Sequence, residues 1–154
     1  MRRTGANGAA GVTTVEFHTG IADPVAFACR LLRKAYRMGS RVQVTAPEPL
    51  LVEIDRALWV QDERDFVPHV RVPGPAKRVL ERTPLWLSHQ PPDTPGVEPP
   101  TVLVNVGAEL DAADLRYGRV IEVVAADVDA AQSGRARWKR CKELGLDVVH
   151  RTSG

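Results

Sequence analysis

The stretch VEFHTGIADPVAFACRLLRKAYRMGSRVQVTA, residues 15–46, decides the fold class of this chain. It opens with a short alternation of apolar and polar residues, which is typical of a half-buried strand. Asp23 and Pro24 then form a helix start signal, and apolar residues recur at helical spacing until Gly39 ends the helix. A second alternating strand follows over residues 41–46. The succession of strand, helix and strand predicts parallel strands joined by a crossover helix.

The remainder of the chain continues the alternation of strands and helices. Further helical segments are predicted at residues 50–59, 110–115 and 128–144. Further strands are predicted at residues 70–72, 85–88, 101–106, 120–125 and 146–149. The proline-rich run QPPDTPGVEPP, residues 90–100, is predicted to be a surface loop, because proline cannot donate to a strand ladder. We therefore expect a three-layer α/β/α sandwich with a mostly parallel, Rossmann-like sheet.

Length and composition indicate one soluble domain. The chain has 154 residues, and its Gly- and Ala-rich residues 1–14 are predicted to be a flexible leader to a single domain over residues 15–154. Cys29 and Cys141 lie in predicted helices without a CxxC motif and are expected to be free thiols in a reducing cytoplasm. No apolar run approaches the roughly 18 residues of a membrane span, so we expect a cytoplasmic protein. Because the net charge is only +2, any contact with nucleic acid would depend on a local patch.

Motifs for cofactor, metal and nucleophile chemistry are missing from the sequence. Neither GxGxxG nor GxxxxGKS/T occurs, so the sheet lacks the glycine-rich loop that cradles a nucleotide phosphate. The four histidines stand singly, and no serine lies in a GxSxG setting. The aspartates near predicted strand ends are interpreted as helix caps or first-turn acids: Asp111, Asp114, Asp127 and Asp129. We expect no cofactor and no metal, and only the fold favours a nucleotide-dependent enzyme.

The segment RARWKRCK, residues 135–142, carries five cations around one tryptophan and no acidic residue. Asp127 stands ahead of it at the position of a helix N-cap. Apolar residues recur at helical spacing: Val128, Ala131, Trp138 and Cys141. A long basic helix is therefore predicted near the end of the chain.

The helical wheel places a cationic rim around Trp138. At about 100° per residue, the cations on its side of the helix are Arg135, Lys139 and Lys142, whereas Arg137 and Arg140 point elsewhere. Such a rim suits a ligand with negative charge beside a flat or apolar group, such as an acidic peptide with a free carboxylate, or single-stranded nucleic acid. The alternative is a solvated amphipathic helix whose tryptophan packs into the core.

Three motifs in a fixed order carry a resemblance to a known family. They are ALW at residues 57–59, FVPH at residues 66–69 and RARWKRCKELG at residues 135–145, and the opening VEFH and MGSRV at residues 38–42 agree with them. Over roughly residues 15–149, the chain resembles the chi subunit of bacterial DNA polymerase III. The resemblance implies an α/β domain without catalytic activity of its own, acting as an accessory subunit of a DNA polymerase holoenzyme.

The resemblance also implies two protein partners and the residues that contact them. One partner is psi, which links chi to the clamp loader, and the other is the acidic C-terminal tail of single-stranded DNA-binding protein. By position, Arg135, Trp138 and Lys139 match the family residues that hold this tail. Ala131 stands where the family has a lysine, so the affinity for the tail is expected to be weaker unless Lys142 substitutes. Direct binding of single-stranded DNA by the same residues is a further alternative, expected to be weak and strongly salt-dependent.

The second partner surface is implied by Trp59, Phe66 and Val67, which match the aromatic and apolar positions that contact psi. Some chi proteins are also associated with a repair helicase through this surface, which gives an alternative partner. Trp59 alone is explained equally well as a core residue. Phe66 is the stronger candidate because acidic and basic residues flank it in DERDF, residues 62–66.

Overall fold

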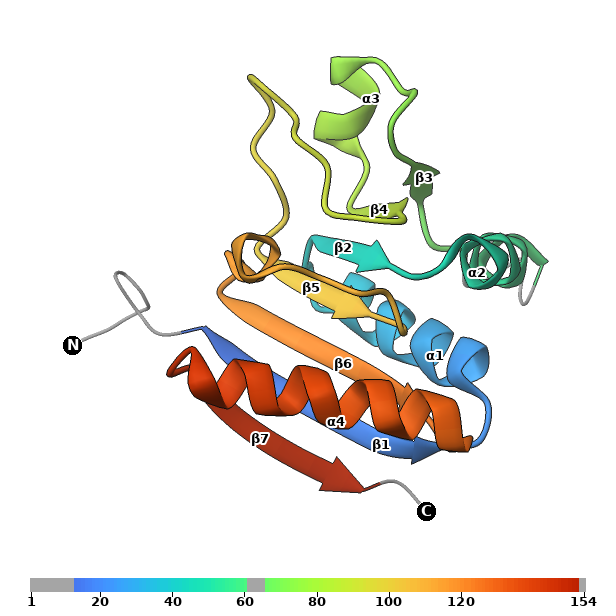
Figure 1. The fold of residues 1–154 in the computed structure, drawn as a ribbon. Helices are drawn as coiled ribbons and strands as arrows, with labels where there is room; N and C mark the ends of the chain where they lie inside the picture. Colours follow the sequence, from blue (N-terminus) through green and yellow to red (C-terminus); the bar gives the residue numbers. More distant parts are fainter. Residues whose placement is uncertain (1–12, 61–65, 153–154) are drawn as a thin grey trace.

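Seven parallel strands form one sheet in the computed structural model, which describes residues 13–60 and 66–152 (Figure 1). The strands are β1 (Thr14–Ile21), β2 (Val42–Thr45), β3 (His69–Arg71), β4 (Leu85–Ser88), β5 (Val102–Asn105), β6 (Arg119–Ala125) and β7 (Asp147–Thr152). Their order across the sheet is β3-β4-β2-β5-β6-β1-β7. Helices α1 (Pro24–Arg37) and α2 (Glu48–Val60) cover one face, and α4 (Val128–Glu143) covers the other (Figure 1). The predicted three-layer α/β/α sandwich is confirmed.

Helix α1 begins and ends where its sequence signals predict. The Asp23 carboxylate accepts a hydrogen bond from the backbone N–H of Ala26 at 3.1 Å, and Pro24 follows at the first helical position. Gly39 adopts a φ of 78° just after the helix, a left-handed conformation that suits glycine. The residues that α1 buries are all apolar: Ala28, Cys29 and Leu32. Both this helix and α2 thus pack on the sheet through ordinary hydrophobic contacts.

Helix α4 packs on the sheet through an unusual set of residues. Asp127 caps it as expected, accepting from the N–H of Ala130 at 3.1 Å. Its buried residues, however, are Gly134, Arg137 and Cys141, whereas Val128 is 74% exposed. Of the four apolar positions that recur at helical spacing, Cys141 is thus buried, and a glycine and a paired arginine complete the side of the helix that faces the sheet. A Cβ added at Gly134 would lie 2.7 Å from Val124 Cγ1, so glycine permits the close approach of helix and strand.

A buried ion pair joins α4 to the sheet. Arg137 Nε donates to Glu122 Oε1 at 3.2 Å, and both side chains are buried. Asn105 Nδ2 also donates to the Glu122 carboxylate at 3.1 Å, and Thr45 Oγ1 donates to Asn105 Oδ1 at 2.9 Å. Burial raises the pKa of Glu122, although the Arg137 charge and these hydrogen bonds oppose the rise. In the sequence, Glu122 is the one charged residue within the apolar strand VIEVVA, and a buried carboxylate of this kind indicates a buried partner of opposite charge.

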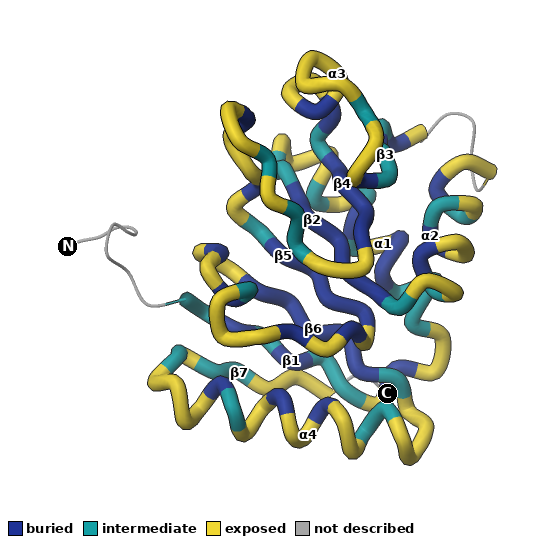
Figure 2. Tube along the Cα trace, turned by 45° about the horizontal axis from the view of Figure 1, so that its top comes forward, coloured by how far each residue is buried: buried dark blue, intermediate teal, exposed yellow. Residues whose placement is uncertain are grey.

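The remaining segments differ in detail from the prediction. A six-residue helix, α3 (Lys77–Arg82), was missed because it is too short to show periodicity, and η2 (Ala112–Leu115) is a 3-10 turn. The proline-rich segment has no helix or strand, but its Val97 is buried against Trp86, Leu80 and Val72. The predicted leader lies outside the described residues except for residues 13–14. Figure 2 shows the buried trace following the central strands, with the outer side of α4 exposed.

The described residues also bear on the cysteines, on metal ligation and on membrane spans. Cys29 and Cys141 are buried free thiols. No group of three His, Cys, Asp or Glu side chains comes together there as a metal-ligand set. None of the helices in residues 13–60 and 66–152 is both long and apolar enough to cross a bilayer.

Candidate functional site

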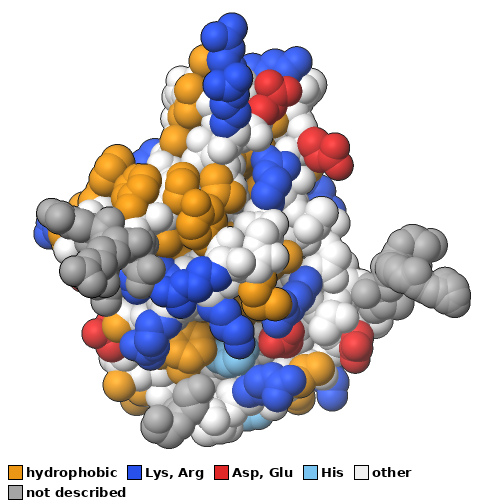
Figure 3. Space-filling view, turned by 180° about the vertical axis from the view of Figure 1, so that it is seen from behind, with side chains coloured by type: hydrophobic (Ala, Val, Ile, Leu, Met, Phe, Trp, Pro, Cys, Tyr) orange, Lys and Arg blue, Asp and Glu red, His pale blue; other side chains and the backbone are white. Residues whose placement is uncertain are grey.

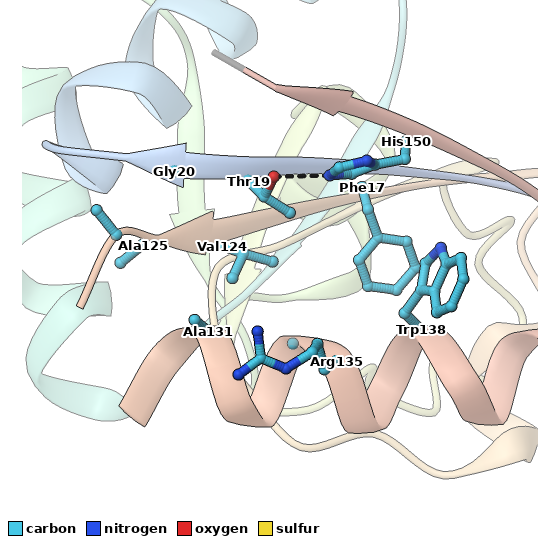
Figure 4. Close-up of a pocket in the computed structure, with 11 residues that line it drawn as sticks. Phe17, Thr19, Gly20, Val124, Ala125, Ala131, Arg135, Trp138 and His150 are labelled. Atoms are coloured by element: carbon cyan, nitrogen blue, oxygen red, sulfur yellow. Dashed lines mark hydrogen bonds between the residues drawn. The ribbon is translucent and has the colours of Figure 1, made fainter. Parts of the chain in front are cut away.

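A pocket of about 460 Å³ opens between α4 and the adjoining strands β1, β6 and β7 (Figure 4). Arg135 and Trp138, both predicted site residues, line it from the helix side. The other lining residues are Phe17, Thr19, Gly20, Val124, Ala125, Ala126, Ala131, Gly134 and His150. We call this site the α4 pocket.

The strand side of the α4 pocket is shaped by an irregularity in β1. The register between β1 and β6 shifts between His18 and Ile21, and Gly20 adopts a φ of 71° within this bulge. Beside it, Thr19 Oγ1 lies 2.7 Å from His150 Nε2, a hydrogen bond that ties β1 to β7 (Figure 4). The strand residues were missed from the sequence because they join the helix only through the order of strands in the sheet.

The chemistry of the α4 pocket combines an apolar interior with one cation. Phe17 and Val124 are buried, and Trp138 is 37% exposed with its indole ring rising from α4 (Figure 4). Arg135 makes no ion pair with any described residue, so its guanidinium is available to a ligand. A guanidinium beside an apolar cavity suits a carboxylate attached to an apolar group.

Not all of the cations predicted to surround Trp138 line the α4 pocket. Arg135 lines it, whereas Lys139 is exposed on the outer surface of α4 and contributes nothing to the lining. Lys142 Nζ lies 4.6 Å from the centroid of the Trp138 ring, which is a cation–π contact at the rim. Ala131 is part of the wall of the α4 pocket. The resemblance in the sequence places a family lysine at this position, so here the wall has a small side chain instead.

The other two arginines of the basic helix have structural contacts. Arg137 pairs with Glu122, as described, and its Nη1 also lies 3.4 Å from Glu109 Oε1. Arg140 Nη1 donates to the backbone carbonyl of Leu110 at 2.6 Å. Both therefore anchor α4 to neighbouring segments instead of extending the cationic rim.

A second group of predicted residues lies near the end of α2, at the opposite edge of the sheet from β7. Trp59 is 58% exposed, Phe66 is 41% exposed, and their ring centroids are 5.1 Å apart. We call these two residues the aromatic pair. Figure 3, viewed from the side of α1 and α2, shows exposed hydrophobic groups beside Lys and Arg side chains. The charged neighbours of Phe66 at residues 62–65 lie outside the described residues.

Val67 does not belong to this exposed surface. It is 1% exposed and packs in the core cluster beneath α1 and α2. Its prediction as a partner contact is corrected to a core position, because its side chain packs among buried apolar residues. Phe66 faces outward and Val67 inward.

The N-termini of helices α1 and α4 are occupied by the chain's own carboxylates. Asp23 caps α1 and Asp127 caps α4. In nucleotide-binding sheets of this type, a phosphate occupies such a helix N-terminus. The caps place negative charge at the position that a phosphate would require, which disfavours the nucleotide-dependent alternative.

Comparison with known proteins gives the family of the chain. Residues 12–149 match the family described as DNA polymerase III chi subunit, HolC. The chain belongs to the DNA polymerase III chi subunit family. A curated relative, the DNA polymerase III subunit chi of Haemophilus influenzae, is 27% identical over 125 residues, which is 79% of this chain and 81% of the relative. The resemblance seen in the sequence is confirmed, and it gives this chi-family chain an accessory role in DNA replication.

Proposed function

We propose that this chi-family subunit is an adaptor with two separate binding surfaces. The α4 pocket binds the acidic C-terminal tail of single-stranded DNA-binding protein, and the aromatic pair binds psi, which connects chi to the clamp loader. In this proposal the chain has no catalytic activity of its own and acts in the cytoplasm. The observation that carries it is Arg135, a cation without an ion-pair partner among the described residues, beside an apolar pocket.

The α4 pocket matches the chemistry of a peptide that ends in an apolar residue. A terminal carboxylate can accept two parallel hydrogen bonds from the Arg135 guanidinium. The apolar side chain of that terminal residue then enters the space bounded by Phe17, Val124 and Trp138. Preceding acidic residues would lie towards the exposed cations Lys139 and Lys142. A volume of about 460 Å³ accommodates a large apolar side chain.

Charge reversal at Arg135 tests the pocket. Arg135→Glu replaces attraction for the peptide carboxylate by repulsion, so the affinity for the tail peptide should fall at least tenfold, about 1.4 kcal/mol, with the fold intact. Added salt should also weaken the wild-type complex, because exposed charges are screened over about 10 Å at 0.1 M. Titration of the tail peptide by calorimetry measures both effects.

The matched control is Arg78→Glu, on the exposed surface of α3 beyond the opposite edge of the sheet (Figure 1). Arg140 is unsuitable because reversing its charge would also break the hydrogen bond to Leu110. Equal losses from Arg135→Glu and Arg78→Glu would contradict a specific pocket. No loss from Arg135→Glu would remove the tail as its ligand, and a single-stranded oligonucleotide in the same titration tests direct DNA binding.

The aromatic pair supports the psi half of the proposal. Large rings with about half of their surface exposed are typical anchors of protein interfaces. Phe66→Ala should weaken psi binding by about 2 kcal/mol, roughly thirtyfold, while the tail peptide still binds to the distant α4 pocket. The repair helicase, titrated against the same variant, tests the alternative partner. A sharp fall in melting temperature with unchanged partner affinity per folded molecule would show that Phe66 serves stability instead.

A further inference from the structure

A buried histidine lies directly behind the aromatic pair. The ring centroid of His69 is 5.1 Å from that of Trp59 and 6.1 Å from that of Phe66. The two outer rings are partly exposed, whereas the His69 side chain is completely buried. The position of the His69 ring therefore limits the positions that the rings of Trp59 and Phe66 can take.

One nitrogen of His69 makes a hydrogen bond, and the other lies beside a carboxylate. Nδ1 lies 2.7 Å from the backbone carbonyl oxygen of Val67, which can only accept a hydrogen bond. Nε2 lies 2.9 Å from Asp55 Oδ1, an ion-pair distance, but it has no hydrogen-bond partner among the described residues. The contact with Asp55 is therefore a close polar approach without hydrogen-bond alignment.

The contacts of His69 connect both segments that supply the aromatic pair. Asp55 precedes Trp59 by four residues on α2, so the two side chains lie on the same side of that helix. The Val67 carbonyl belongs to the residue directly after Phe66. One imidazole thus contacts the helix that bears Trp59 and the backbone that bears Phe66. Loss of either contact would free one ring relative to the other.

We infer that Asp55 and His69 are positioning residues of the partner-binding surface: their pair holds Trp59 and Phe66 in one arrangement before a partner arrives. The inference rests on the proposed function of the aromatic pair. Holding the rings in advance increases affinity because less side-chain and loop freedom is lost on binding. Neither residue needs to touch the partner for this effect.

Two substitutions at Asp55 separate positioning from direct charge recognition. Asp55→Ala removes the carboxylate beside Nε2, so psi affinity should fall roughly fivefold or more, with tail-peptide affinity unchanged as the control for folding. Asp55→Asn should retain most of the psi affinity, because its amide keeps the shape of the carboxylate and a polar group beside Nε2. Equal losses from both variants would overturn the positioning role and assign Asp55 a charge contact with psi.

Long-range ¹H–¹⁵N NMR spectra of the histidines give a second readout. The ring signals of His69 should shift in Asp55→Asn relative to the wild-type protein, because Nε2 lies 2.9 Å from the substituted group. Unchanged His69 signals in Asp55→Asn would overturn the assigned contact. His69→Phe, which keeps a ring but donates no hydrogen bond, should lose affinity like Asp55→Ala.

The failure of this inference is distinct from the failure of the proposed function. If Trp59→Ala and Phe66→Ala bind psi as tightly as the wild-type protein, the aromatic pair is not the psi site and both proposals fall. If these variants lose affinity while Asp55→Ala and His69→Phe do not, the adaptor function stands and the positioning role is wrong.

Discussion

The helices on the two faces of the sheet are attached by different chemistry. Every buried residue of α1 and α2 is apolar, including Leu32 and Ile54. The buried residues of α4 include Gly134 and Arg137, the first in close approach to Val124 and the second paired with Glu122. Apolar contacts tolerate exchange of similar side chains, whereas an ion pair and a close backbone approach each require particular residues. The α4 pocket thus depends on the less tolerant of the two attachments.

The largest expected effect comes from breaking the ion pair beneath α4. Glu122→Gln leaves the buried Arg137 with only the largely exposed Glu109 carboxylate as an opposite charge, which should lower the free energy of unfolding by about 3–5 kcal/mol in a urea titration. The double variant Glu122→Leu with Arg137→Met removes both charges and should recover most of this loss. A double variant as unstable as the single one would show that the pair contributes more than charge compensation.

A cavity beneath α1, on the opposite face of the sheet, should lower the free energy of unfolding by nearly as much but leave the α4 pocket intact. Leu32→Ala removes buried apolar volume beneath α1 and should cost about 3 kcal/mol in the same urea titration. The affinity for the tail peptide should not change among folded molecules, because α1 supplies none of the pocket lining. Weakened peptide binding at a temperature where the variant is fully folded would indicate that the two faces are coupled.

A smaller effect is expected where helix and strand approach most closely. Gly134→Ala places a methyl group 2.7 Å from Val124 Cγ1, and the resulting strain should outweigh the better helix propensity of alanine, with a net loss of about 1–2 kcal/mol. The tail peptide should also bind more weakly, because both residues line the α4 pocket. Adding Val124→Ala makes room for the methyl group and should restore part of the stability. No recovery would mean that the clash lies elsewhere.

The smallest expected effect is the pH dependence of stability that arises from the Cys141 thiol beneath α4. Burial, followed by the charge of Glu122, raises the pKa of Cys141 from 9.0 to about 11. Between these values the unfolded chain loses the thiol proton first, so the contribution of Cys141 to stability is complete below pH 9 and is lost as the pH rises towards 11. Stability of the wild-type protein should therefore decline more steeply over this range than that of Cys141→Ala. Parallel curves from urea titrations at several pH values would contradict the raised pKa.

The parts of the fold and the site that could be predicted from the sequence are those that depend on helical periodicity. The start signal at Asp23 and Pro24 and the spacing after it determine α1, and the same spacing brings Arg135 and Trp138 to one side of α4. These features are local, because a helix places residues three and four apart side by side whatever surrounds it.

The missing parts of the prediction depend on contacts between distant segments. The strand residues Phe17 and His150 reach the α4 pocket because β1 lies between β6 and β7, an order that no local pattern encodes. The burial of Arg137 follows from Glu122, fifteen positions earlier in the chain. Val67 and Phe66 could not be told apart because the direction of a side chain in a loop is set by the core that it meets.

The two outermost strands of the sheet have a consequence for behaviour at high concentration. An open parallel sheet leaves unpaired backbone groups along each edge, where a second molecule could add a strand and begin aggregation. At one edge, β3 is only three residues long. At the other edge, β7 exposes the polar residues Asp147, His150 and Arg151. A short strand and a charged one both disfavour such addition, so we expect the protein to remain dispersed in concentrated solution.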